Sequence, residues 1–185
     1  MKVIETKLPG VLIIEPKVFG DHRGFFLESY HEQRYQEMGI KERFVQDNHS
    51  RSAAGVLRGL HFQKQRPQGK LVRVTQGEVY DVAVDINPTS ATFGQYVGVV
   101  LSGENHTQLY VPPGYAHGFC VLSETADFLY KCTDYYDPTD EGGIVWNDPT
   151  VNIDWPISNP KLSEKDQNSQ SLLEYAASLQ NGDAE

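Results

Sequence analysis

Residues 56–74, VLRGLHFQKQRPQGKLVRV, place His61 between two candidate anion-binding side chains, Arg58 and Lys70. Apolar side chains dominate the first part, a Gln-Gly pair marks a turn, and a second apolar run follows it. The segment therefore predicts a strand, a loop and a strand, with His61 on a strand or at its end, where a rigid scaffold can aim it. A lone histidine is more often a hydrogen-bonded structural residue than a catalytic one, so its role depends on what the rest of the chain places near it.

Short strand-forming segments follow at intervals of about ten residues, each bounded by Gly, Pro, Ser or Asn. Residues 78–86, EVYDVAVDI, alternate with period two, which predicts a half-buried strand with Tyr80 and Val82 on one face and Val79 and Asp81 on the other. The segments YVGVVLS, HTQLYVP, HGFCVLS and ADFLYKCT continue the series. Regular short strands without long helices between them are typical of a sandwich or barrel, so we expect an all-β jelly roll, also called a double-stranded β-helix.

Helical signals are few and short. Residues 31–38 predict a short helix that Gly39 ends. Residues 172–179 carry leucines and an alanine at helical spacing, which predicts a C-terminal amphipathic helical segment. Because no internal repeat or linker divides the chain, we expect a single domain over residues 1–185, with residues 177–185 as a disordered tail.

Composition and charge limit the classes of partner. The chain has 185 residues and a formal net charge of −9, which argues against nucleic acid or an anionic membrane as a partner. An anionic small ligand would need a local cluster of Arg and Lys. The N-terminus lacks the features of a signal peptide, and no apolar run approaches the ~18 residues of a membrane span. Two cysteines are too few for a disulfide framework, so we expect a cytoplasmic protein.

Several polar residues have both a structural and a functional interpretation. Arg23, in a turn flanked by glycines, is either a solvated charge or an anion clamp. Residues 46–48, Gln-Asp-Asn, form either a polar loop or contacts to a nucleobase or sugar. Tyr130 alternates onto the same, inward face as Phe128, where it is either a core residue bonded to a carbonyl or a proton donor facing His61.

A second histidine motif lies at residues 112–117, where Pro-x-Gly-x-x-His resembles the second histidine motif of the cupin jelly rolls. Cupins that hold a metal pair this motif with an earlier His-x-His and a glutamate. Here His61 is followed by Gln63, and Lys70 stands where the glutamate is expected. Because an ammonium group repels a divalent cation, the pattern predicts a metal-free cationic pocket at the mouth of the barrel, lined by His61, Lys70 and His117.

The motifs taken together resemble those of the dTDP-4-dehydrorhamnose 3,5-epimerases. In chain order they are DHRGFFLE, VQDNHS, VLRGLHFQ, QGKLVRV, GEVYDVAVDI, TFGQYVGVVLS, VPPGYAHGF, LYKCTDYYDP, GGIVWNDP, IDWP and LSEKD, and they run from about residue 3 to 175. The resemblance implies a jelly-roll homodimer with no metal and no redox cofactor. It also implies a substrate, dTDP-4-keto-6-deoxyglucose, that is inverted at C3 and C5 to dTDP-4-dehydro-L-rhamnose in dTDP-L-rhamnose biosynthesis.

The chemistry of a 4-ketosugar agrees with this implication. The protons on C3 and C5 flank the carbonyl, so inversion needs a base, an acid on the opposite face and a positive group near the enolate oxygen. By resemblance His61 is the base, Tyr130 the acid, and Lys70 faces the carbonyl oxygen. Asp166 would support the His61 imidazolium. Considered alone, Asp166 fits better a capping box that begins with Ser163, and the resemblance reverses that preference.

The resemblance also implies the residues that bind the nucleotide sugar. Arg23 and Arg58 would hold the diphosphate, and Tyr136 would stack on thymine. The remaining predicted substrate contacts are Glu28, Gln46, Asp47, Asn48, Lys70, His117, Glu141 and Lys165. Regular strand alternation would point Arg58 and His61 to opposite faces, so the assignment requires a bulge or kink, which Gly59 permits.

Three alternatives stay open on the sequence alone. A metal-dependent cupin enzyme would bind its metal through His61 and His117. A closer alternative inverts only C3 or only C5, or isomerises the ketone of a dTDP-4-ketosugar. A non-catalytic sugar-binding jelly roll would not need the pair of His61 and Tyr130.

Overall fold

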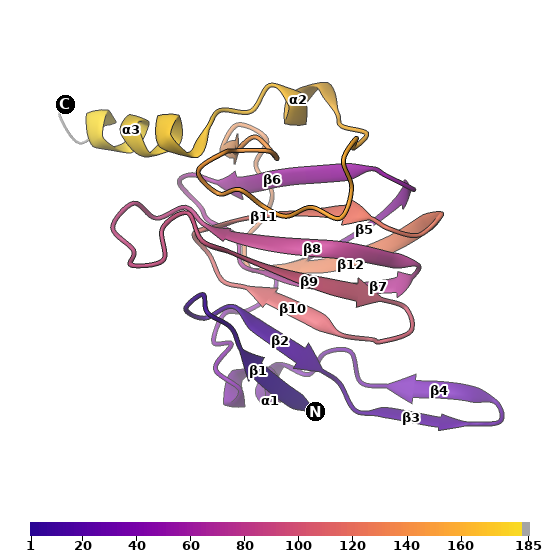
Figure 1. Cartoon of the computed structure of the whole chain (residues 1–185). Coiled ribbons are helices and arrows are strands. Elements are labelled where there is room, and N and C mark those ends of the chain that lie inside the picture. Colours follow the sequence, from indigo (N-terminus) through magenta and orange to yellow (C-terminus); the bar gives the residue numbers. More distant parts are fainter. Residues whose placement is uncertain (183–185) are drawn as a thin grey trace.

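Two antiparallel sheets form the body of the protein (Figure 1), and the computed structural model describes residues 1–182. The first sheet contains, in spatial order, β1 (Lys2–Glu5), β2 (Leu12–Glu15), β10 (Gln108–Val111), β7 (Lys70–Gln76), β12 (Thr125–Cys132) and β5 (Gln46–Ala53). The second contains β13 (Glu141–Gly143), β6 (Leu57–Gln63), β11 (Tyr115–Val121), β8 (Glu78–Asp85) and β9 (Tyr96–Ser102). The predicted all-β jelly roll is confirmed.

The main core lies between the inward faces of the two sheets. On β12, Ala126 and Phe128 are buried and Tyr130 packs against the same cluster, so the predicted inward face of this strand is confirmed. Val72 on β7 and Val79 on β8 meet them from neighbouring strands. Burying an apolar side chain of this size contributes about 1.5–3 kcal/mol, so the alternating pattern itself fixes which face of each strand turns inward.

Strand β8 is buried on both faces, so the prediction of a half-buried strand is wrong. Its outward-facing Val82 and Val84 pack in a second cluster with Ile144, Leu172 and Tyr175. These partners belong to the C-terminal segment, which runs across the outside of the second sheet (Figure 1). Alternation within a strand reports only its own residues, and it cannot show that a distant segment covers the outer face.

Short helices complete the chain. Helix α1 (Glu32–Glu37) ends before Gly39, whose φ of +100° favours glycine, as predicted. Helices α2 (Glu164–Gln167) and α3 (Leu172–Gly182) follow the last strand. Helix α3 continues through residues 177–182, where we expected a disordered tail; residues 183–185 lie outside the described residues. No helix among residues 1–182 is long and apolar enough to cross a membrane.

The hairpin of β3 (Val18–Asp21) and β4 (Gly24–Leu27) stands apart from both sheets and projects from the body (Figure 1). We call it the β3–β4 arm. Its side chains Phe19, Phe25 and Phe26 are 53%, 63% and 69% exposed. Phe25 packs against His106, with ring centroids 4.5 Å apart, and most of the aromatic surface of the arm is exposed in the single chain.

Candidate active site

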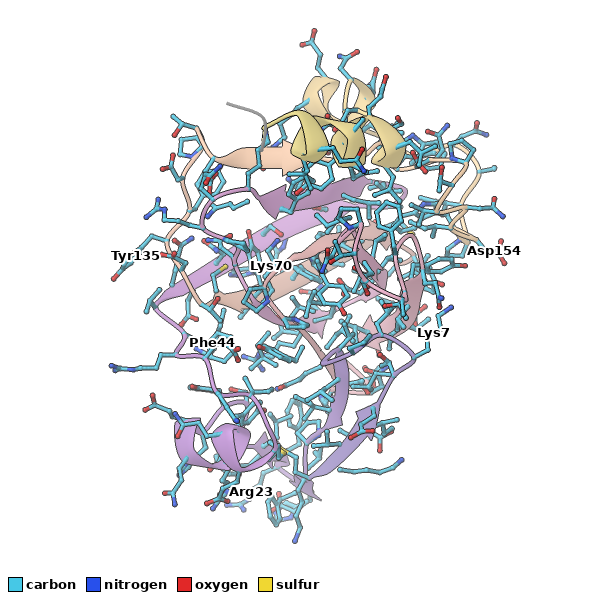
Figure 2. The ribbon with its side chains drawn as sticks, turned by 90° about the vertical axis from the view of Figure 1, so that its left-hand side faces the viewer. Lys7, Arg23, Phe44, Lys70, Tyr135 and Asp154 are labelled. Atoms are coloured by element: carbon cyan, nitrogen blue, oxygen red, sulfur yellow. The ribbon has the colours of Figure 1, made fainter. Side chains whose placement is uncertain are left out.

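A cavity of about 300 Å³ opens between the two sheets, and most of the predicted site residues line it. The lining residues that the sequence predicted are Gln46, Asn48, Arg58, His61, Lys70, His117, Tyr130, Tyr136 and Glu141. They come from β5, β6, β7, β11, β12 and β13 and from the loop before β13. Figure 2 shows Lys70 among the strands in the middle of the molecule, consistent with its place in the cavity wall.

A bulge in β6 brings Arg58 and His61 to the same cavity. The sheet register sets His61 opposite His117 and Arg58 opposite Phe119, so three steps along β6 span two along β11. Between them Gly59 has a φ of +116°, and a Cβ atom there would lie 2.7 Å from the Cα of Gly118. Only glycine fits this backbone, and the predicted bulge is confirmed.

His61 is paired with a buried carboxylate. Its Nε2 lies 2.6 Å from Oδ1 of Asp166, whose side chain is 4% exposed. Burial by itself raises the pKa of the Asp166 carboxyl, but the hydrogen bond and charge of His61 outweigh it and the pKa is lowered. An ionised Asp166 can accept a hydrogen bond from Nε2–H of His61, and in that tautomer Nδ1 is the ring nitrogen that can take up a proton.

Asp166 makes both a capping contact with Ser163 and the predicted contact with His61. Its backbone N–H donates to Oγ of Ser163 at 3.1 Å, which caps the start of α2. Its carboxylate is therefore free of the cap and reaches His61 instead. The cap holds the helix end in place, and the helix end aims the carboxylate.

Tyr130 and Lys70 face the cavity from the first sheet. Burial raises the pKa of the Tyr130 phenol, so the hydroxyl keeps its proton at neutral pH. Lys70 is 9% exposed, and burial lowers the pKa of its ammonium group. Lys70 lines the cavity between the two sheets, where its amino group can meet an oxygen of a bound molecule.

Glu141 links the rim of the cavity to helix α2. Its Oε2 accepts a hydrogen bond from the Tyr136 hydroxyl at 2.9 Å, and its Oε1 accepts one from Nζ of Lys165 at 2.7 Å. The bond to Glu141 raises the pKa of Tyr136. Burial opposes ionisation of Glu141, but the bonds from Lys165 and Tyr136 lower its pKa overall. Lys165 therefore joins the site through Glu141 without lining the cavity itself.

His117 has a partner that sequence reasoning missed. Its Nε2 lies 2.9 and 3.0 Å from the two carboxylate oxygens of Asp81, which is fully buried. Alternation placed Asp81 and Val79 opposite Tyr80 and Val82 on a strand expected to be half-buried, so the pattern did not indicate that Asp81 is buried and needs a partner. Within residues 1–182, no group of three or more His, Cys, Asp or Glu side chains is arranged to hold a metal ion.

Five predicted residues do not line the cavity. Asp166 and Lys165 contact it through His61 and Glu141, and the other three lie farther away. Arg23 pairs with Asp21 on the β3–β4 arm, at the lower end of the molecule in Figure 2. Glu28 accepts a hydrogen bond from Arg34 at 2.7 Å. Asp47 binds Lys131 at 2.9 Å on the outer face of the first sheet, because alternation along β5 turns its two neighbours inward and Asp47 outward.

The comparisons with known proteins point to one family. The family model for dTDP-4-dehydrorhamnose 3,5-epimerase matches residues 5–174. A dTDP-4-dehydrorhamnose 3,5-epimerase from Salmonella typhimurium is 62% identical over 169 residues, which cover 90% of this chain and 92% of that protein. A dTDP-4-dehydrorhamnose 3-epimerase from Streptomyces niveus is 39% identical over 176 residues, covering 94% of this chain and 85% of that protein.

A solved structure agrees with them. The crystal structure of a dTDP-6-deoxy-D-glucose-3,5-epimerase from Legionella pneumophila, in complex with dTDP-4-keto-L-rhamnose, superposes with a TM-score of 0.93. It is 57% identical in sequence, and the match covers 96% of each chain.

Proposed function

The chain belongs to the dTDP-4-dehydrorhamnose 3,5-epimerase family, and from that premise we propose that its cavity inverts C3 and C5 of dTDP-4-dehydro-6-deoxy-D-glucose. The product is dTDP-4-dehydro-L-rhamnose, for dTDP-L-rhamnose biosynthesis. The observation that carries the proposal is His61, which is paired with Asp166 and lines the same cavity as Tyr130. A base and an acid on separate walls are what inversion at a carbon beside a ketone needs.

Each inversion is two proton transfers. Neutral His61 removes the proton from the carbon beside the ketone, the C–H electron pair forms the enolate, and Asp166 stabilises the resulting imidazolium. Tyr130 then returns a proton to the opposite face of that carbon. Before the second inversion, His61 gives its proton to solvent and the Tyr130 phenolate takes one up. The positive charge of Arg58 partly offsets the effect of burial on the pKa of Tyr130, which supports this role.

Lys70 is the proposed partner of the enolate oxygen. The enolate places negative charge on O4, and a fixed ammonium group in a buried site stabilises that charge far more than water does. The position of Lys70 in the cavity wall supports the assignment. The role requires the protonated form of Lys70, so the site must keep that lysine charged at the working pH.

The two arginines predicted to bind the diphosphate lie apart in one chain. Arg58 lines the cavity, whereas Arg23 lies on the β3–β4 arm, outside it. We therefore propose a homodimer in which the arm of each chain reaches the other, so that Arg23 and Glu28 of the partner subunit complete the diphosphate and nucleoside contacts. The exposed aromatic side chains of the arm support this arrangement. A cytoplasmic location stays a prediction from the sequence.

Two-centre inversion is the better supported of the family's activities. The relatives named as 3,5-epimerases are 62% and 57% identical to this chain, and the 3-epimerase is 39% identical. This order favours inversion at both C3 and C5. This choice between inversion at one and at two carbons does not depend on any single residue of the cavity.

The test is deuterium incorporation from deuterated water into the 4-ketosugar, followed by NMR. We expect exchange at both C3 and C5 with the wild type and loss of both in His61→Ala. General acid–base groups contribute on the order of 100- to 10,000-fold. His49→Ala is the matched control, since His49 lies outside the cavity and binds Asp127. Exchange at one carbon would identify a mono-specific epimerase, and no exchange would identify a binding protein.

A further inference from the structure

The side-chain amide of Gln63 holds the loop that joins β12 to β13. Gln63 is 5% exposed and ends strand β6. Its Nε2 donates to the backbone carbonyl groups of Arg66 at 2.8 Å and Tyr135 at 3.3 Å, and its Oε1 accepts the backbone N–H of Asp137 at 2.7 Å. Both N–H groups of the amide are engaged in these bonds, so the side chain acts on the loop although it lines the cavity. Tyr136 lies between the two loop residues that Gln63 holds.

Two more glutamine side chains hold neighbouring residues of the same loop. Nε2 of Gln68 donates to the backbone carbonyl group of Asp134 at 2.7 Å, and Oε1 of Gln46 accepts the backbone N–H of Tyr136 at 2.9 Å. Each of the four consecutive residues 134–137 is thus bonded to a glutamine side chain. We call Gln46, Gln63 and Gln68 the glutamine clamp.

The glutamine clamp sets where the ring of Tyr136 lies. Tyr135 and Tyr136 are 61% and 50% exposed, so burial in the core does not anchor either ring. Tyr135 projects from the edge of the molecule (Figure 2), whereas Tyr136 lines the cavity. The bond from the Tyr136 hydroxyl to Glu141 fixes the far end of the ring, and the clamp fixes the backbone from which the ring extends.

We propose that Gln63 and Gln68 are positioning residues for the nucleoside, and that the clamp holds the Tyr136 ring where the thymine base stacks on it. This inference rests on the proposed function, whose substrate carries dTDP. Stacking one base on an aromatic ring is worth roughly 5- to 150-fold in affinity. The full gain requires a ring that is held before the ligand arrives, because ordering a mobile loop on binding costs part of it.

The first experiment measures binding by calorimetry with two probes, dTDP and pyrophosphate, which lacks the base. Gln63→Met keeps the approximate volume of the side chain and removes its three hydrogen bonds. The Kd for dTDP should rise roughly 5- to 20-fold, and the Kd for pyrophosphate should stay unchanged. An unchanged Kd for dTDP, or an equal loss with both probes, overturns the proposal.

Asn87→Ala is the control for the loss of an amide that holds a turn. Oδ1 of Asn87 accepts the backbone N–H of Thr89 at 3.0 Å, and Asn87 does not line the cavity. This variant should leave the Kd for both probes unchanged. A rise in the Kd for dTDP equal to that of Gln63→Met would show a general effect of destabilisation and overturn the proposal.

The second experiment asks whether the clamp acts through the ring of Tyr136. In a Tyr136→Ala background, Gln63→Met should no longer weaken dTDP binding, because the group that it positions is gone. Equal weakening in both backgrounds overturns the proposal. Gln68→Met removes a single bond and should give the same pattern with a smaller effect, so it serves where Gln63→Met does not fold.

The wild type supplies a test that needs no substitution. The backbone N–H groups of Tyr136 and Asp137 donate to glutamine side chains, so they should be protected from hydrogen exchange in the free protein. Exchange at the rate of an unstructured peptide overturns the clamp. Deuterium incorporation into the 4-ketosugar tests the proposed function separately, so a protein that binds dTDP as expected but fails to exchange C3 and C5 would refute the proposed function and leave the clamp in place.

Discussion

Replacing Asp166 with asparagine separates the charge of the carboxylate from its shape. The side chain is 4% exposed and its Oδ1 lies 2.6 Å from Nε2 of His61, so solvent cannot replace the lost charge. The backbone N–H that donates to Ser163 is retained, and the start of α2 should persist. What changes is the stabilisation of a positively charged His61 during proton transfer.

The magnitude follows from the kind of bond that is lost. A hydrogen bond to a charged group contributes about 1.5–3 kcal/mol. Since each 1.36 kcal/mol is a tenfold change in rate, kcat should fall by roughly 10- to 160-fold. KM should change little, because Asp166 does not line the cavity. A fall in kcat at constant KM is the signature of an interaction made in the transition state.

The assay is the initial rate of epimerisation at saturating substrate, with urea unfolding of the same samples. Asp148→Asn is the matched control, because Asp148 is 1% exposed and accepts the backbone N–H groups of Val151 and Leu172, away from the cavity. That variant should lose stability and keep its kcat. A kcat for Asp166→Asn within about twofold of wild type, or an equal loss in the control, would refute the pairing as a catalytic device.

The pair of His61 and Asp166 also predicts how the free energy of unfolding depends on pH in acid. The folded-state pKa of Asp166 is lowered, so the ionised pair stabilises the fold above the unfolded pKa of about 3.9 and loses that contribution as the pH falls through the folded value. The difference in unfolding free energy between wild type and Asp166→Asn should therefore shrink as the pH is lowered below that range. A difference independent of pH would show that the charge of Asp166 does not stabilise the fold.

Three further outcomes are expected. Tyr130→Phe should lower kcat with nearly unchanged KM, because the lost proton donor acts in the transition state, and a changed KM with normal kcat would contradict it. Arg58→Lys keeps the charge but loses the planar fork, so KM should rise and competitive inhibition by dTDP should weaken; equal inhibition of both proteins would mean that Arg58 does not bind the diphosphate. Prolonged chelation should leave activity unchanged if Lys70 stabilises the enolate, and recovery of lost activity on adding divalent ions would disprove this.

Predictions from the local sequence pattern were confirmed where they depended on the residues of one strand. Alternation along β12 placed Tyr130 inward with Phe128, and the conflict between Arg58 and His61 located the bulge at Gly59. These features depend on the period of the strand and on the freedom of glycine, which are properties of neighbouring residues. The helix over residues 177–182 escaped the same reasoning, because its N-terminal half is anchored by burial of Leu172 and Tyr175 on a distant sheet.

The sequence by itself determined the strands around His61, the strands from residue 78 to 132, the inward face of β12 and, through its motifs, which histidine, lysine and tyrosine share the cavity. It did not predict β5, whose first residues were interpreted as a polar loop or as ligand contacts. Only the tertiary structure decided the pairs between distant segments: Asp81 with His117, and Glu141 with Lys165. It also separated Asp47 and Arg23 from the cavity of their own chain. Periodicity tells which way a side chain points, but its partner depends on sheet register and on how the C-terminal segment crosses the second sheet, and those are set by packing across the whole fold.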